Sequence, residues 1–253
     1  MESNERNWLA AGDLEFRLRP WIIAAIFFAA FELYQWDHVR AAAALAGWLT
    51  PSGGNVHATE TLIFGAGAAL ALAAAALRTW AAAYMSSSVV HDPQVHDSRL
   101  VADGPYRYLR NPLYLGVILI TCGIALTASR SGFVLLVVAI TFFQYRLTLR
   151  EEQALKATQG EGYRRYLAAV PRMIPSLRPR VPAGGMRPRW GQAFYGEFFM
   201  WGFALAFVLF VATGNNRIFM WGCIGATALV LLMGRLNTRN TTKQIAQRVA
   251  GNG

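Results

Sequence analysis

Long apolar runs with few charges recur along this chain of 253 residues and place it in a membrane. A helix needs about 20 apolar residues to cross a bilayer, because the hydrocarbon is about 30 Å thick. The sequence predicts six such helices, at roughly 21–36, 61–85, 112–128, 132–149, 193–213 and 217–234. The Ala-rich stretch 41–49 either extends the first helix or forms a separate re-entrant piece. We therefore expect an all-α polytopic membrane protein with a helical cytoplasmic segment after the fourth span.

The positive charges of the chain are concentrated on one side of these spans. The chain has 24 Lys and Arg residues and a formal net charge of +10. Those that fall elsewhere are Arg40, Arg130, Arg217 and, within the second span, Arg78. Because cytoplasmic loops carry the excess of basic residues, we expect both termini and the connections 86–111 and 150–192 in the cytoplasm. The basic residues flank apolar spans, which indicates membrane lipids and no nucleic acid as partners.

The spans divide into a core and a C-terminal part. Residues 1–175 hold the first four spans and form the expected core. Residues 176–192 are rich in Pro, Gly and Arg, a composition typical of a linker that lies along the lipid headgroups. Residues 193–253 hold a second pair of spans and a polar tail. An alanine-rich chain with more Arg than Lys favours a bacterial inner membrane.

A basic, aromatic turn precedes the third span. Residues 104–116 read Gly-Pro-Tyr-Arg-Tyr-Leu-Arg-Asn-Pro-Leu-Tyr-Leu-Gly. Asn111 is a good helix cap and Pro112 fits the first position of a helix, so we expect the helix to begin here with Asn capping its free amides. The positive end of the helix dipole would then face an anionic group beside Arg107 and Arg110.

Two adjacent carboxylates, Glu151 and Glu152, follow the fourth span. A short turn at 129–132 makes the third and fourth spans an antiparallel pair, which returns these carboxylates to the level of the basic turn. Adjacent residues on a helix point about 100° apart. We therefore expect at most one of the two to face a ligand, and the other to pair with Lys156 or Arg150.

The order and spacing of these residues resemble a known superfamily. The residues that carry the resemblance are Gly104-Pro105-Tyr106-Arg107, Arg110-Asn111-Pro112-Leu113-Tyr114-Leu115-Gly116, Glu151-Glu152, Tyr163, Tyr166 and Val170-Pro171-Arg172. They are similar to the isoprenylcysteine carboxyl methyltransferases and phospholipid methyltransferases, which implies a membrane enzyme that binds S-adenosylmethionine from the cytosol. The resemblance also implies a lipophilic methyl acceptor that enters from the bilayer. The carboxyl methyltransferases usually have His at the position of Asn111, where the phospholipid enzymes resemble this chain better.

The residue types of the motif suit that cofactor. Arg side chains and helix amides bind a carboxylate, a carboxylate accepts ribose hydroxyls, and Tyr stacks on adenine. The candidate cofactor-binding residues are Tyr106, Arg107, Arg110, Asn111, Pro112, Tyr114, Gly116, Glu151, Glu152, Tyr163, Tyr166 and Arg172. The candidate catalytic residues are Arg110, Glu152 and Arg78. Displacement from a sulfonium depends chiefly on alignment, so we expect no metal site.

Other interpretations stay open for several of these residues. Arg78 lies about two turns from the cytoplasmic end of its span, within reach of the interface for a long side chain. Gly116 and Gly123 share a helix face and permit close approach of either a neighbouring helix or a ligand. For the whole chain, the alternatives are an NADPH-dependent reductase of the steroid reductase type and a non-enzymatic lipid-binding protein. The methyl acceptor can be a carboxylate, an amine, a thiol or a lipid headgroup.

Overall fold

The described part of the chain, residues 8–85 and 102–229, is helical and contains no β-strand in this computed structural model. The α-helices are α1 (Asp13–Arg17), α2 (Arg19–Glu32), α3 (Ala41–Leu49), α4 (Val56–Ala83), α5 (Pro112–Ala125), α6 (Arg130–Ala169) and α7 (Trp190–Thr213). Short 3-10 helices are η1 (Leu33–Gln35) and η3 (Gly104–Arg107), and residues 216–229 are also helical. The predicted all-α class is therefore confirmed.

Three of the described helices are long and apolar enough to cross a membrane: α4, α6 and α7. The helices α2 and α5 are apolar but have only 14 residues each, fewer than a perpendicular span needs. The prediction of six spans is not confirmed, and the sixth, 217–234, lies partly outside the described residues. The Ala-rich stretch forms a separate helix, α3, and does not extend the first helix.

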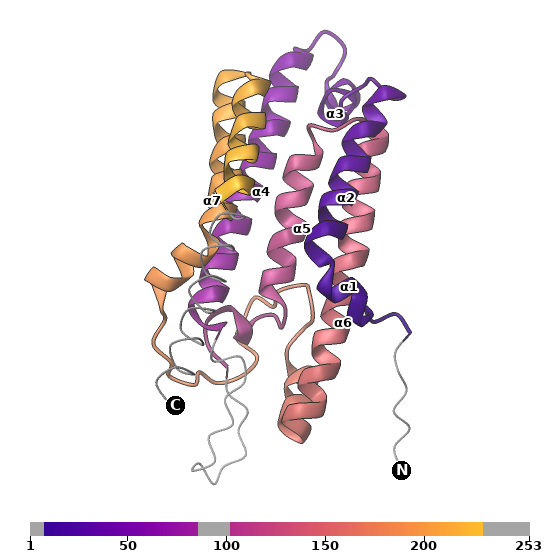
Figure 1. Cartoon of the computed structure of the whole chain (residues 1–253). Helices are drawn as coiled ribbons and strands as arrows, with labels where there is room; N and C mark the ends of the chain where they lie inside the picture. Colours follow the sequence, from indigo (N-terminus) through magenta and orange to yellow (C-terminus); the bar gives the residue numbers. More distant parts are fainter. Residues whose placement is uncertain (1–7, 86–101, 230–253) are drawn as a thin grey trace, which may run out of the picture.

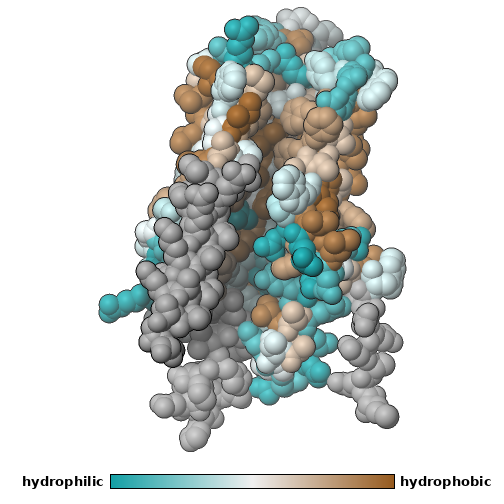
Figure 2. Space-filling view, viewed as in Figure 1, coloured by the Kyte–Doolittle hydropathy of each residue, from teal (hydrophilic) through white to brown (hydrophobic). Residues whose placement is uncertain are grey.

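The long helices stand side by side as a bundle (Figure 1). On one side α5 packs between α4 and α6, while α7 covers another face of α4 and α2 lies against α6. Large apolar side chains are exposed on the outer faces, including Val138 and Phe142 of α6 and Leu209 of α7. Figure 2 shows hydrophobic residues over the middle of one face and hydrophilic residues at its upper rim and lower part. This distribution fits an integral membrane protein.

The predicted antiparallel hairpin is formed by α5 and α6. The turn lies a few residues earlier than expected, because the Ser129 hydroxyl accepts a hydrogen bond from the Gly132 amide at 3.1 Å and so caps α6. The helical segment expected after the fourth span is present, and it is a continuation of α6 through the polar residues. Gly160, with φ of 60°, interrupts it before a last short helical stretch.

The glycines of α5 allow α5 to approach α4 closely. A Cβ atom on Gly123 would lie 2.5 Å from the Gly67 carbonyl oxygen of α4. A Cβ atom on Gly116 would lie 2.3 Å from Cγ of Arg78, also on α4. Of the two expectations for these glycines, a helix and a ligand, the structure shows the helix.

The basic segment before α7 packs against the turn that precedes α5. The Arg180 amide donates to the Arg107 carbonyl at 2.8 Å, and the Ala102 amide donates to the Pro182 carbonyl at 3.3 Å. The buried carboxylate of Asp103 accepts from three consecutive backbone amides, those of Gly184, Gly185 and Met186. The segment expected to follow the headgroups therefore also holds the turn in place.

Candidate active site

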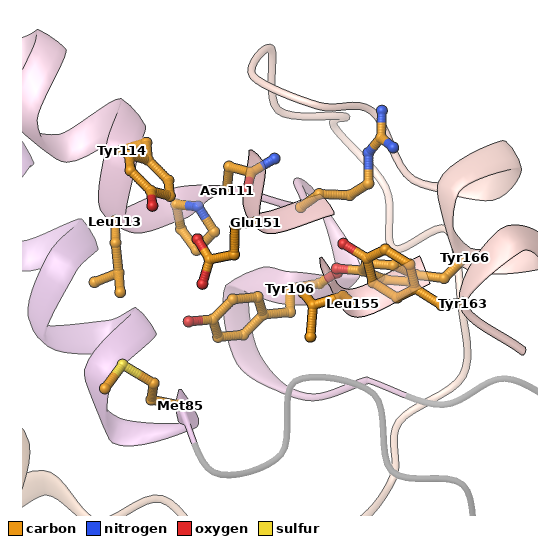
Figure 3. A pocket seen from close by; sticks show the side chains of 11 residues that line it. Met85, Tyr106, Asn111, Leu113, Tyr114, Glu151, Leu155, Tyr163 and Tyr166 are labelled. Atoms are coloured by element: carbon orange, nitrogen blue, oxygen red, sulfur yellow. The ribbon is translucent and has the colours of Figure 1, made fainter. Parts of the chain in front are cut away.

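A pocket opens at the end of the bundle where α5 begins (Figure 3). Its walls come from the end of α4, from η3 and the residues after it, from the first turn of α5 and from the lower part of α6. The lining residues are Met85, Tyr106, Arg110, Asn111, Pro112, Leu113, Tyr114, Glu151, Leu155, Tyr163 and Tyr166. The cavity volume is about 80 Å³. The basic turn and the acidic pair thus meet at one end of the molecule, as the hairpin predicted.

The turn before α5 is shaped by a glycine and a buried tyrosine. Gly104 has φ of 55°, and a Cβ atom there would lie 2.3 Å from the Tyr84 ring, so that glycine suits the position. Tyr106 is buried, and its carbonyl accepts a hydrogen bond from the Tyr166 hydroxyl at 2.7 Å. Burial raises the pKa of Tyr106, so its hydroxyl stays protonated and can donate at neutral pH.

Asn111 occupies the cap position of α5, as predicted, but its side chain does not cap the helix. Its amide nitrogen donates instead to Glu152 at 2.9 Å and to the Arg172 carbonyl at 3.3 Å. The expectation of a side-chain cap was therefore wrong, because the side chain is turned towards α6. Without that cap, the first-turn amides of α5 remain next to the pocket that Pro112, Leu113 and Tyr114 line.

Glu152 is the centre of a buried ionic network. One carboxylate oxygen accepts from Arg172 Nε at 3.0 Å and Nη2 at 2.9 Å, and the other lies 3.4 Å from Arg110 Nη1. A buried carboxylate needs such partners to offset its desolvation. The expected pairing with Lys156 or Arg150 was wrong, since Arg150 bonds Asp13 at 2.6 Å. Glu152 does not line the pocket.

Glu151 is the acid that faces the pocket. Figure 3 shows the hydroxyls of Tyr106 and Tyr114 on either side of its carboxylate. The two acids therefore point to different surroundings, as their adjacent positions on a helix predict. Glu151 is exposed to the pocket and to solvent, whereas Glu152 is buried.

Arg110 joins the ionic network to the pocket. Its side chain is 10% exposed and also lines the pocket, and Glu152 is the carboxylate that approaches it. Its Nε atom is buried and has no hydrogen-bond partner among the described residues. Burial lowers the pKa of Arg110, and the Glu152 charge opposes that shift. Arg110 therefore contributes a cation to the pocket wall, but its buried Nε can reach an anionic ligand group only if the wall moves.

Aromatic and apolar side chains form the remaining wall. Tyr163 and Tyr166 follow the interruption at Gly160 and are both buried, with ring centroids 5.7 Å apart. Leu155 lies one helical turn after Glu151, and Met85 closes the side towards α4. A flat aromatic ligand group would find stacking surfaces here. Met85, Leu113 and Leu155 line the pocket but were not among the candidate site residues, although Leu113 lies within the motif and Leu155 lies at helical spacing from Glu151.

Several candidate residues lie outside the pocket lining. Arg107 Nε donates to the Val181 carbonyl at 3.1 Å, and Gly116 faces α4. Arg172 lies behind the pocket, where it also bonds the Tyr145 hydroxyl at 2.9 Å. Arg78 pairs with Glu197 of α7 and does not reach the cavity. These residues support the pocket from behind.

Comparison with protein families identifies the segment that carries these elements. Residues 62–161 match the family model described as phospholipid methyltransferase. The expected resemblance to the integral membrane methyltransferase superfamily is therefore confirmed. The matched segment contains most of the pocket but excludes Tyr163, Tyr166, Arg172 and all of α7. No curated protein and no solved structure matched the chain.

Proposed function

We propose that this chain is a membrane methyltransferase that takes its methyl group from S-adenosylmethionine and transfers it to a lipophilic acceptor. The observation that carries the proposal is the pocket itself, in which a cation, Arg110, lies together with an acid, Glu151, and several tyrosines. The family match to residues 62–161 supports the reaction class. The resemblance to that family implies the cofactor, and the donor set of the pocket agrees with it.

The residues of the pocket fit the three polar parts of that cofactor. Arg110 and the first-turn amides of α5 suit the carboxylate of its amino-acid moiety. Glu151 offers an acceptor for the ribose hydroxyls, and Tyr163 offers a ring for the adenine. The cavity of about 80 Å³ is smaller than the roughly 300–1,000 Å³ typical of ligand pockets. Binding therefore requires the pocket walls to separate.

When bound, the cofactor supplies a methyl group on a sulfonium that a nucleophile can displace in one step. Arg110 would hold its amino-acid carboxylate and Glu151 its ribose, and two such contacts would orient the methyl group. Tyr163 and Tyr166 keep water from that side of the pocket. Such alignment accounts for much of the rate of a displacement of this kind. An ammonium acceptor must first lose a proton, and Glu151 is the pocket carboxylate that can accept it.

We favour a lipid headgroup amine as the acceptor. Asn111 stands where the carboxyl methyltransferases usually have His, and the matching family model is that of the phospholipid enzymes. We place the pocket on the cytoplasmic side of a bacterial inner membrane, with both termini on the same side, because the basic residues gather there. We also treat residues 1–175 as the enzymatic core, 176–192 as the linker and 193–253 as an added C-terminal part.

Titration of the purified protein with S-adenosylmethionine and, separately, with NADPH tests the cofactor. We expect S-adenosylmethionine to bind and Arg110→Met to weaken binding by at least about tenfold, the value of one hydrogen bond to a charged group. Arg187→Met is the matched control, because it removes the same charge at an exposed position outside the pocket lining. Preferential binding of NADPH would contradict the proposal and favour a reductase.

A further inference from the structure

A buried ion pair joins α7 to α4 beside the pocket. Arg78 Nε donates to Glu197 Oε2 at 2.7 Å, and Arg78 Nη2 donates to Glu197 Oε1 at 2.9 Å. The side chains are 14% and 9% exposed. Such a two-point contact neutralises the charge of the guanidinium and also fixes its orientation. Glu197 lies in α7, outside the segment that matches the methyltransferase family.

The third arm of the same guanidinium reaches the pocket wall. Arg78 Nη1 donates to the Leu113 carbonyl at 2.9 Å, and Leu113 belongs to the first turn of α5 that lines the pocket. Gly116, one turn further along α5, provides the space for the Arg78 side chain. The first turn of α5 therefore has the pocket on one side and Arg78 on the other.

The position of Arg78 depends on its carboxylate partner. A buried guanidinium without a counter-charge is strongly destabilised and turns towards water where it can. The centroid of the Phe199 ring of α7 lies 5.7 Å from Arg78 Cζ, but an aromatic ring supplies no full counter-charge. Removing the Glu197 charge would therefore pull Arg78 away from Leu113 and release the first turn of α5.

We infer that Glu197 is a positioning residue for the pocket, acting through Arg78 and the Leu113 carbonyl, so that α7 is part of the functional unit. This inference rests on the proposed function for its effect on the methyl donor. Its structural part, the hold on the first turn of α5, stands independently. The ion pair would therefore hold the pocket wall in place, in addition to joining α4 to α7.

A neighbouring contact provides the matched control. Trp201 Nε1 of α7 donates to the Thr79 hydroxyl of α4 at 3.0 Å, one turn along α7 from Glu197. Trp201→Phe removes a polar contact between the same two helices but leaves Arg78 and Leu113 bonded. Arg78→Met with Glu197→Met replaces the ion pair by apolar side chains, which often preserves folding while it removes the contact to Leu113.

The experiment measures two quantities for wild type, Glu197→Gln, the double Met variant and Trp201→Phe. One is the affinity for S-adenosylmethionine, and the other is amide hydrogen exchange over residues 115–118. We expect Glu197→Gln and the double Met variant to lose about tenfold in affinity, the value of one hydrogen bond to a charged group. Both should exchange faster over 115–118, whereas Trp201→Phe should match wild type in both measurements.

A double Met variant with wild-type affinity and wild-type exchange would overturn the inference, since the pair would then only join the helices. Equal losses in Trp201→Phe would overturn it as well, because any loosening of α7 would suffice. If wild type itself binds no S-adenosylmethionine, the proposed cofactor is wrong. In that case the exchange comparison among the four proteins still decides whether Glu197 holds the first turn of α5.

Discussion

Replacing each of the two adjacent acids of α6 by Gln should have a different effect: the change at Glu152 should lower stability, and the change at Glu151 should weaken binding of the methyl donor. Glu152 is buried among Arg110, Arg172 and Asn111, so Glu152→Gln leaves two guanidinium groups without their carboxylate. Breaking a buried pair by removing one partner costs about 3–5 kcal/mol. Arg172 is 32% exposed, so water compensates part of its loss, and we expect about 3 kcal/mol at most.

That loss should appear as a lower melting temperature. A change of 1 kcal/mol moves the midpoint of a domain of this size by about 2–4 °C, so Glu152→Gln should lower it by up to about 6–12 °C. Glu151 faces the pocket and solvent, so Glu151→Gln should change stability by less than about 0.5 kcal/mol. It should instead weaken S-adenosylmethionine binding by about tenfold, through one lost hydrogen bond to a charged group.

Thermal unfolding in detergent and titration with the methyl donor, run on both variants, make the comparison. The reasoning is refuted if Glu152→Gln melts like wild type, because the ionic network would then contribute nothing. It is also refuted if Glu151→Gln unfolds as early as Glu152→Gln, because the pocket would then not separate the roles of the two acids.

Two further predictions concern packing and pH. Gly116→Ala should lower the melting temperature and weaken methyl-donor binding, because its Cβ would displace Arg78, whereas Gly65→Ala, with no atom within 4 Å, should leave binding unchanged and should not lower the melting temperature. The Arg130 guanidinium lowers the pKa of Asp37 to about 2, below its ordinary 3.8. This ion pair should therefore stabilise the fold above pH 3.8 and lose its effect as the pH falls through 2, while Asp37→Asn should lack that dependence in melting curves.

The parts that the sequence predicted correctly depend on local signals. Asn111 and Pro112 mark the start of α5 because the preference of proline for the first helical turn is a property of the backbone alone. The turn between α5 and α6 is short, which forces the two helices to run antiparallel and brings Glu151 to the basic turn. Neither inference required knowledge of distant residues.

The wrong predictions concern side chains whose partners are determined by burial or by a distant segment of the chain. Helical spacing suggested Lys156 or Arg150 as partners of Glu152, but the structure selects Arg172, which returns after the end of α6. The Asn111 side chain leaves the cap because Glu152 offers it a buried charged acceptor.

The contacts from α7 and from the linker were beyond the sequence for the same reason. Glu197 and Arg78 are 119 positions apart, and no pattern in either span indicates the pairing. The linker composition predicted a location at the membrane surface, but the three amides that bind Asp103 are backbone groups with no sequence signature. Long-range contacts of this kind follow from the packed fold alone.

The most direct test of the central claim is methyl transfer itself. Purified wild type and Arg110→Met, each kept well below its own melting temperature, are incubated with methyl-labelled S-adenosylmethionine and a bacterial membrane lipid extract, and the lipids are analysed by mass spectrometry. Wild type should yield a headgroup lipid heavier by one labelled methyl group, and Arg110→Met should yield little or none. An absence of labelled lipid with wild type, or equal labelling by both proteins, would contradict the account.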